Sequence, residues 1–111
     1  MRYMFLIYSN EQAPENQDPG LGPAYGVFTQ EVNEKQVFRA GDPLQSVATA
    51  TTVRVRNDNP LISDGPFAET KEQLGGYYIL DCKDLDEALA YAAKIPSAKY
   101  GSIEVRPIME M

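Results

Sequence analysis

Apolar and polar residues recur with two different periods along the chain, and these periods predict its elements. The compact apolar run from Tyr3 to Tyr8 predicts a strand buried on at least one face. Ser9 to Gly22 has the composition of a loop, and Pro23 then stands where a first helical position is expected. A short strand follows from Val37 to Ala40 and is expected to end at Gly41-Asp42-Pro43. The helix before that strand is predicted from four apolar residues at helical spacing: Ala24, Val27, Phe28 and Val32.

The middle of the chain changes to a period of two, which predicts paired strands. From Thr51 to Arg56, valines alternate with polar residues, and the alternation places Arg54 and Arg56 on one face. Asn57 to Pro60 has turn chemistry, and Leu61 begins a returning strand. The sequence therefore predicts a β-hairpin here.

The last third predicts a strand, a helix and a further strand. Tyr77 to Asp81 is the most strand-like run of the chain, and Ser102 to Met109 alternates again. Asp84 and Glu87 have the spacing of a capping box, and Pro96 marks where the intervening helix must end. The side of that helix expected to face the core carries Leu85, Ala88, Leu89 and Ala92.

The predicted order is β, α, β, an added hairpin, β, α, β. It indicates a single α+β domain over residues 1–111, a ferredoxin-like βαββαβ sandwich with both helices on one face of the sheet. The other face is left open. Because such faces are commonly buried against a copy of the same chain, we expect a homodimer.

The open face supplies the candidate ligand-binding residues. If Val53, Val55, Ile103 and Val105 face the helices, the charged residues between them face away, together with one of two neighbouring tyrosines. Arginine grips carboxylates or phosphates, and tyrosine offers a hydroxyl and a ring, so a dimer would enclose a site for a small anionic or aromatic molecule. The alternative is that Glu104 pairs with an arginine across the dimer and nothing else binds. The candidates are Arg54, Arg56, Tyr77, Tyr78, Glu104 and Arg106.

The stretch from Asp64 to Gly76 carries the candidate catalytic residues. Asp64 and Glu72 are carboxylates that would act as general bases in cofactor-independent proton transfer, such as an isomerisation or elimination. The competing interpretations are that Asp64 caps the backbone of an Asp-Gly-Pro turn and that Glu72 belongs to a solvated turn. Gly75-Gly76 is interpreted as tight backbone geometry at the start of a strand.

Composition narrows the classes of function. The net charge of −6 argues against nucleic acid as a partner, since that affinity comes from clustered lysine and arginine. The absence of histidine excludes a histidine base, a histidine-centred triad and the commonest transition-metal ligand. We predict no metal and no cofactor. No apolar run approaches the roughly 20 residues of a membrane span, so no membrane partner is predicted and the chain is expected to be cytoplasmic.

The long central motif from Asp64 to Tyr78 reads Asp-Gly-Pro-Phe-Ala-Glu-Thr-Lys-Glu-Gln-Leu-Gly-Gly-Tyr-Tyr. It is specific, and it resembles the motif of one family, the DGPF branch of the YCII-related proteins. The resemblance covers essentially the whole chain. It also includes Arg2 to Met4, Ala48 to Arg56, Ile95-Pro96 and Tyr100 to Met109.

The resemblance implies a dimeric α/β barrel, an architecture shared by small monooxygenases, isomerases and ligand-sensing modules. Members of this branch are often encoded beside sigma factors, which implies a third possibility, an adaptor whose 64–76 loop contacts a protein of a sigma-factor pathway. In the shorter branch a His–Asp pair has been suggested as a catalytic dyad, and this chain has no histidine to supply it. The first loop, Glu11 to Gly22, also departs from the family pattern, being richer in Pro and Gly.

Overall fold

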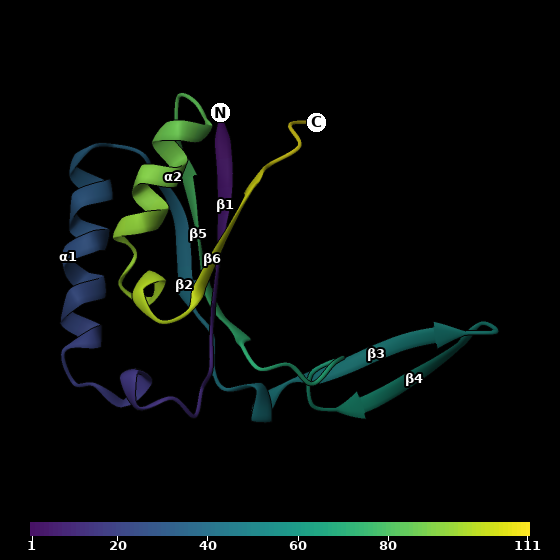
Figure 1. Cartoon of the computed structure of the whole chain (residues 1–111). Helices are drawn as coiled ribbons and strands as arrows, with labels where there is room; N and C mark the ends of the chain where they lie inside the picture. Colours follow the sequence, from purple (N-terminus) through teal and green to yellow (C-terminus); the bar gives the residue numbers. More distant parts are fainter.

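Four antiparallel strands and two helices form the body of the domain, and a separate hairpin extends from it (Figure 1). The computed structural model describes the whole chain, residues 1–111. The main sheet has the order β2-β5-β1-β6, and both helices lie on one of its faces. This confirms the predicted ferredoxin-like α+β fold with an added hairpin. The elements are β1 (Arg2–Ser9), α1 (Leu21–Glu34), β2 (Phe38–Pro43), β3 (Thr51–Arg56), β4 (Asn59–Asp64), β5 (Gln73–Asp81), α2 (Leu85–Lys94) and β6 (Ser102–Pro107), with 3-10 turns at Pro14–Gln17, Val47–Thr49 and Pro96–Lys99.

The core lies between the main sheet and the two helices. Along β1 every second side chain points toward the helices, and Phe5 in the middle of the strand is fully buried. Leu80 of β5 and Val32 of α1 are also 0% exposed. Because side chains alternate across a strand, this single buried face fixes the register of β1 against its two neighbours. No helix of the structure has the length and apolar character needed to cross a membrane.

Helix α1 begins two residues before the predicted position and buries a different stripe. Phe28 and Val32 face the core as predicted, but Val27 is 69% exposed. Tyr25 takes its place, since it lies three residues before Phe28 and packs against the core. The apolar stripe therefore runs along positions 25, 28 and 32 of the helix.

Helix α2 begins at its predicted cap. The side chain of Asp84 accepts a hydrogen bond of 2.9 Å from the backbone N–H of Glu87. The predicted core side of this helix is partly wrong, because Leu85 and Leu89 are 47% and 49% exposed. Tyr91, whose ring is 8% exposed, packs against the core instead.

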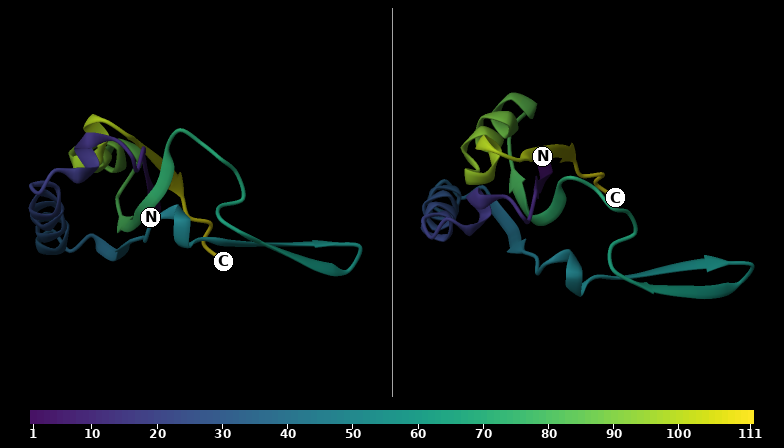
Figure 2. Two further views of the ribbon diagram at one scale, coloured as in Figure 1. Left: turned by 90° about the horizontal axis from the view of Figure 1, so that it is seen from below. Right: turned by 60° about the horizontal axis from the view of Figure 1, so that its bottom comes forward.

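The hairpin is confirmed, but it does not belong to the main sheet. Strands β3 and β4 pair only with each other, through a two-residue turn in which Asn57 and Asp58 have φ of 51° and 63°. These residue types tolerate the left-handed conformation that such turns need. The pair extends away from the body as an arm in every view (Figure 2).

The expected placement of the β3 side chains is therefore wrong. Val53 and Val55 do not face the helices, since they are 61% and 60% exposed on the arm. Arg54 and Arg56 consequently do not lie on the open face of the main sheet. The alternation read in the sequence is real, but it separates two faces of a free hairpin rather than a core face from a surface face.

The open face of the main sheet is present as predicted. Ile103 and Val105 of β6 pack against the core, so Glu104 and Arg106 point to the opposite side. On β5 the register sends Tyr78 to the helices and Tyr77 to the open face. The apolar side chains of the open face include Met4, Leu6 and Ile79, which are half-buried and covered by no helix.

Candidate functional site

A cavity of about 800 Å³ opens between α1, the first loop and one edge of the main sheet. Its walls come from five segments far apart in the chain: the end of β1 with the following turn, α1, β2, the start of β5 and the turn after α2. Four aromatic residues border it: Tyr25, Phe38 and Tyr78 lie on the helix side of the sheet, and Tyr77, whose side chain points to the open face, borders it at the sheet edge. The volume falls in the range typical of small-molecule sites.

Tyr78 forms the inner wall of this cavity. Its ring meets Phe28 edge-on with centroids 5.2 Å apart, and Phe38 flanks it at 6.2 Å. The hydroxyl lies 2.7 Å from that of Thr29, and burial raises the pKa of the Tyr78 phenol. Tyr78 therefore presents a neutral hydroxyl held in place by α1.

A chain of hydroxyl and amide groups forms the polar part of the wall. The hydroxyls of Tyr25 and Ser97 lie 2.7 Å apart, and Ser97 is only 3% exposed. Tyr100 approaches Ser97 at 3.3 Å and donates to Asn16 at 3.3 Å. Burial raises the pKa of the Tyr25 phenol, so this group also stays protonated near neutral pH.

Asp42 and Tyr77 form a pair at the edge of the cavity. The Tyr77 hydroxyl donates a hydrogen bond of 2.6 Å to Oδ2 of Asp42, across the β2–β5 pairing. This bond to Asp42 raises the pKa of the Tyr77 phenol. A carboxylate at the edge of a cavity can accept a proton from a bound hydroxylated molecule.

The cavity contains two carboxylates and no lysine or arginine. Besides Asp42, the second is Glu11, and its carboxylate is engaged in structure. It accepts a hydrogen bond of 2.8 Å from the Ser46 hydroxyl and another of 3.0 Å from the Val47 backbone N–H. The lining thus offers hydrogen-bond donors and acceptors but no cation to bind an anionic group.

Glycines let the sheet edge close against this site. A Cβ on Gly41 would lie 2.7 Å from the Tyr78 ring, and one on Gly76 would lie 3.0 Å from the Asp42 carbonyl oxygen. The tight backbone geometry predicted for Gly75-Gly76 is confirmed at Gly76, but the predicted strand start is wrong, because β5 already begins at Gln73. Both positions need the absence of a side chain because of close approach, not because of unusual φ.

A second cavity of about 550 Å³ lies at the base of the hairpin arm. Tyr8 and Leu74 line it from the main sheet, and Phe67 lines it from the 64–76 stretch. Glu72 is the only charged residue in its lining. One oxygen of Glu72 accepts a 2.8 Å hydrogen bond from the Ser102 hydroxyl of β6.

The predicted catalytic carboxylates are separated in space. Asp64 ends β4 on the exposed arm and lines neither cavity. Glu72 is half-buried and lines the second cavity. The two are not brought together, and their catalytic roles stay predictions.

The predicted ligand-binding residues are also divided. Only Tyr77 and Tyr78 line the larger cavity. Arg54 on the arm donates a hydrogen bond of 3.2 Å to the Phe67 carbonyl oxygen, and Arg56 donates one to the carbonyl oxygen of Val55. Glu104 and Arg106 lie 3.9 Å apart on one exposed strand and line neither cavity.

Sequence reasoning missed most of the larger cavity. Tyr25 carried a usable signal, because it lies at helical spacing from Phe28 and Val32. Ser97 and Asn16 carried none, since each acts through a contact with a residue far away in the chain.

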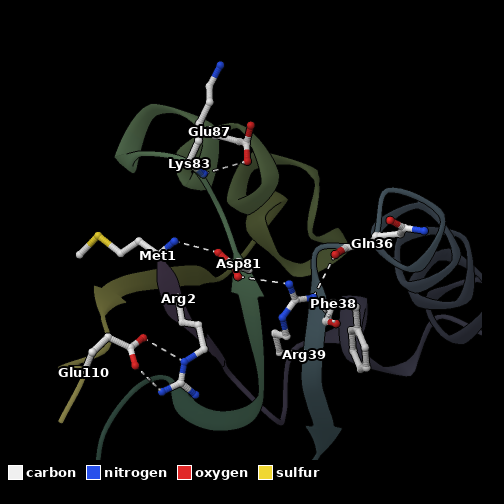
Figure 3. Close-up of polar contacts among 9 residues, drawn as sticks. All are labelled: Met1, Arg2, Gln36, Phe38, Arg39, Asp81, Lys83, Glu87 and Glu110. Atoms are coloured by element: carbon white, nitrogen blue, oxygen red, sulfur yellow. Dashed lines mark hydrogen bonds and ion pairs between the residues drawn. The ribbon is translucent and has the colours of Figure 1, made fainter.

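Other charged groups hold the opposite end of the main sheet (Figure 3). Arg2 bonds Glu110 through two nitrogens at 3.0 Å each, and Asp81 pairs with Met1 and with Arg39. In the β1–β5 pairing, Arg2 lies opposite Asp81 at one end, and Gly76 lies near the other end, beside the cavity. Arg2 and Arg39 are therefore occupied in ion pairs away from the cavity.

The fold and the site together define a small ferredoxin-like domain with a ligand-sized cavity under its first helix. The model of the YCII-related domain matches residues 1–111, and the chain therefore belongs to the YCII-related family. An uncharacterised protein of Rhizobium meliloti (strain 1021) is 48% identical over 67 residues. That match covers 59% of this chain and 54% of the other protein, so it spans about half the length of that relative.

Among solved structures, one similar fold is that of 5-chloro-2-hydroxyhydroquinone dehydrochlorinase (TftG) from Burkholderia phenoliruptrix AC1100, in complex with 2,5-dihydroxybenzoquinone. The TM-score is 0.57 with 12% identity, over 100% of this chain and 96% of that one. At this identity the likeness establishes the fold alone. It supports the ferredoxin-like α+β fold, in which the sheet of a single chain is open.

Proposed function

We propose that this protein binds a small hydroxylated aromatic molecule in the larger cavity. The observation that carries the proposal is the lining itself: the aromatic rings of Tyr25, Phe38 and Tyr78, neutral hydroxyls fixed by hydrogen bonds, and no lysine or arginine. Rings stack favourably on rings, and phenol hydroxyls can donate to Asp42 or accept from Tyr25. Of the two ligand classes expected from the sequence, this lining favours the aromatic one over the anionic one.

The structural neighbour gives independent support for this ligand class. Its bound molecule is 2,5-dihydroxybenzoquinone, a hydroxylated ring of the size that an 800 Å³ cavity accommodates. The shared fold alone does not transfer an activity. The proposal therefore rests on the residues that line the cavity of this chain.

A steric block of the cavity tests the proposal. Gly26 lines the cavity on α1, and a Cβ there would meet no atom within 4 Å. Gly26→Leu should place a bulky side chain at the α1 wall of the cavity without disturbing the helix, since leucine is the better helix former by up to about 1 kcal/mol. Gly22 on the same helix has equally open surroundings and does not line the cavity, so Gly22→Leu is the matched control.

The measurement is thermal shift followed by titration calorimetry with catechol, hydroquinone and 2,5-dihydroxybenzoquinone. Benzoate serves as the anionic comparison and cyclohexanediol as the non-aromatic one. We expect the hydroxylated rings to bind the wild type and Gly22→Leu, and to lose at least about tenfold in affinity for Gly26→Leu, because the leucine side chain takes up space that the ring needs against α1. Equal binding by the two variants, or stronger binding of benzoate, would overturn the proposal.

The proposal includes a homodimer formed through the open face of the main sheet. Met4, Leu6 and Ile79 form an apolar row on that face, and such rows are commonly buried against a second copy. Leu6→Glu should convert the dimer to a monomer in light scattering after size exclusion. Leu89→Glu, at an exposed position of α2, should leave the mass unchanged. A monomeric wild type would remove the dimer and leave the cavity proposal standing.

The Asp42–Tyr77 pair favours a second candidate function, proton transfer on the bound ring. A carboxylate 2.6 Å from a phenol can take a proton from a ring hydroxyl or an acidic ring carbon while Tyr77 stabilises the charge that develops. The test is deuterium incorporation into the carbons of resorcinol in D₂O, followed by NMR. Incorporation that depends on Asp42, and is lost in Asp42→Asn while binding is kept, is the expected result. Equal rates with and without protein would discard this candidate.

A further inference from the structure

The second cavity, at the base of the arm, is chemically different from the first. Tyr8 and Leu74 line it from the strand ends next to the arm, beyond the Met4, Leu6 and Ile79 row, and Phe67 lines it from the 64–76 stretch. Phe67 is 77% exposed despite its size, so its ring is available to a ligand. Exposed aromatic surface beside a cavity is a feature of binding sites more than of folding.

Glu72 gives this cavity its charge. It is half-buried, and none of the ion pairs of the chain includes it. Only the Ser102 hydroxyl bonds to its carboxylate, which leaves the second oxygen without a partner. Arg54 donates to the Phe67 carbonyl, and Lys71 does not line the cavity.

One carboxylate oxygen of Glu72 is therefore free to bind a ligand, and three classes of ligand can be compared against it. An anion is repelled by Glu72. A neutral molecule leaves the carboxylate less hydrated and still unpaired. A bare metal ion needs several oxygen ligands, and no group of three or more acidic or cysteine side chains gathers in the structure.

An organic ammonium ion satisfies every part of this lining. Its charge pairs with Glu72, its N–H groups donate to the free carboxylate oxygen, and its apolar body fits against Tyr8, Leu74 and Phe67. Aromatic rings also attract a cation through their π faces. We propose that the second cavity is a binding site for a small aryl-alkyl amine, separate from the cavity under α1.

The experiment compares three molecules of one shape and different charge: 2-phenylethylamine, 2-phenylethanol and 3-phenylpropionate. Titration calorimetry on the wild type should give the amine at least about tenfold tighter binding than the alcohol, with no binding of the carboxylate, because only the amine pairs with Glu72. Amine affinity should fall with added salt, since the charge pair is partly exposed.

Two variants test the assignment of the site. Glu72→Gln keeps an acceptor for Ser102 and removes the charge, so it should bring amine affinity down to that of the alcohol. Glu69→Gln, an exposed carboxylate of the same stretch outside the cavity, is the matched control and should bind as wild type. Phe67→Ala, at an exposed position where unfolding is not expected, should weaken binding of both amine and alcohol.

Equal affinity for amine and alcohol, no measurable amine binding at millimolar concentration, or equal losses in Glu72→Gln and Glu69→Gln would overturn the proposal. The Gly26→Leu variant separates the two sites. Its amine binding should equal that of the wild type, and a loss of amine binding there would move the amine to the larger cavity and also overturn the assignment.

Discussion

The hydroxyl oxygens of Tyr25 and Ser97 lie 2.7 Å apart and connect α1 to the turn after α2, 72 residues away along the chain. Ser97 is buried, so its hydroxyl depends on protein partners rather than on water. Tyr100 provides the second partner at 3.3 Å. This contact both joins the two helical segments and forms a wall of the larger cavity.

Tyr25→Phe should therefore lower stability and weaken binding of hydroxylated rings together. The loss of one part-buried hydrogen bond is expected to cost about 1 kcal/mol, measured by urea unfolding. Tyr91→Phe is the matched control, since the Tyr91 ring is buried but its hydroxyl has no hydrogen-bond partner within the chain. Equal effects of the two changes would contradict a specific role for the Tyr25 contact.

Gly41→Ala should destabilise the domain through a clash with Tyr78. The added Cβ would lie 2.7 Å from one ring carbon of Tyr78 and 3.2 Å from the Phe38 ring. Tyr78 cannot move away easily because Phe28 packs against it and Thr29 holds its hydroxyl. We expect a loss of about 1–3 kcal/mol in the free energy of unfolding. Gly22→Ala, in open space on α1, should be neutral or stabilising, and the same result at Gly41 would refute the clash.

Cys82 should be unreactive in the folded protein. Burial is the main cause that raises its pKa from 9.0 to about 11, with nearby carboxylates adding to it, and the side chain is 1% exposed. At pH 8 this lowers the thiolate population about 100-fold, so reaction with Ellman's reagent should be slow until denaturant is added. Fast labelling of the native protein would contradict this burial.

The raised pKa of Cys82 also predicts that the domain loses stability as the pH rises through the alkaline range. The folded state holds the Cys82 proton more tightly than the unfolded chain does, so this contribution is complete below pH 9. It should be lost as the pH rises from about 9 to about 11. Urea unfolding of wild type and Cys82→Ala across this range checks it, since the variant should lack that part of the alkaline decline.

Glu11→Gln should loosen the contact between the first loop and the 3-10 turn that precedes β3. The carboxylate accepts from both Ser46 and the Val47 N–H, whereas an amide side chain has one acceptor and would lose one bond. Exchange of the Val47 amide hydrogen should rise about fivefold, which corresponds to about 1 kcal/mol. Glu15→Gln on the same loop, where the side chain makes no hydrogen bond, should leave that exchange unchanged. Unchanged exchange in Glu11→Gln would show that the bond to Val47 contributes nothing.

The helices and strands were predictable because each buries one face, and this burial sets the spacing of the apolar residues along the sequence. The cap at Asp84 and the strand from Tyr77 were readable for that reason. Strand β2 runs on to Pro43, past its predicted end, because it is an edge strand where a missing N–H costs nothing. The placement of the arm was not readable, since Val53 and Arg54 would alternate in the same way in either sheet.

The site was less predictable than the fold, for a physical reason. Alternation narrows the choice to one of Tyr77 and Tyr78 for the open face, but only the register against β1 decides between them. The larger cavity is built from contacts such as Tyr25 with Ser97 that join distant segments. Neighbouring residues in the sequence do not reveal such contacts. The charge of Glu72, which distinguishes the second cavity, can be read directly from the sequence.

The segment from Leu44 to Ser46 has a consequence for occupancy, because Leu44 and Ser46 line both cavities. Any shift of this shared wall on binding changes the shape that the other ligand meets. Thermodynamic reciprocity then requires that the factor by which a ring in one cavity alters amine affinity equal the factor by which the amine alters ring affinity. Two titrations in opposite order would thus report one coupling free energy, and its sign would tell whether the domain responds to the two molecules as alternatives or as a pair.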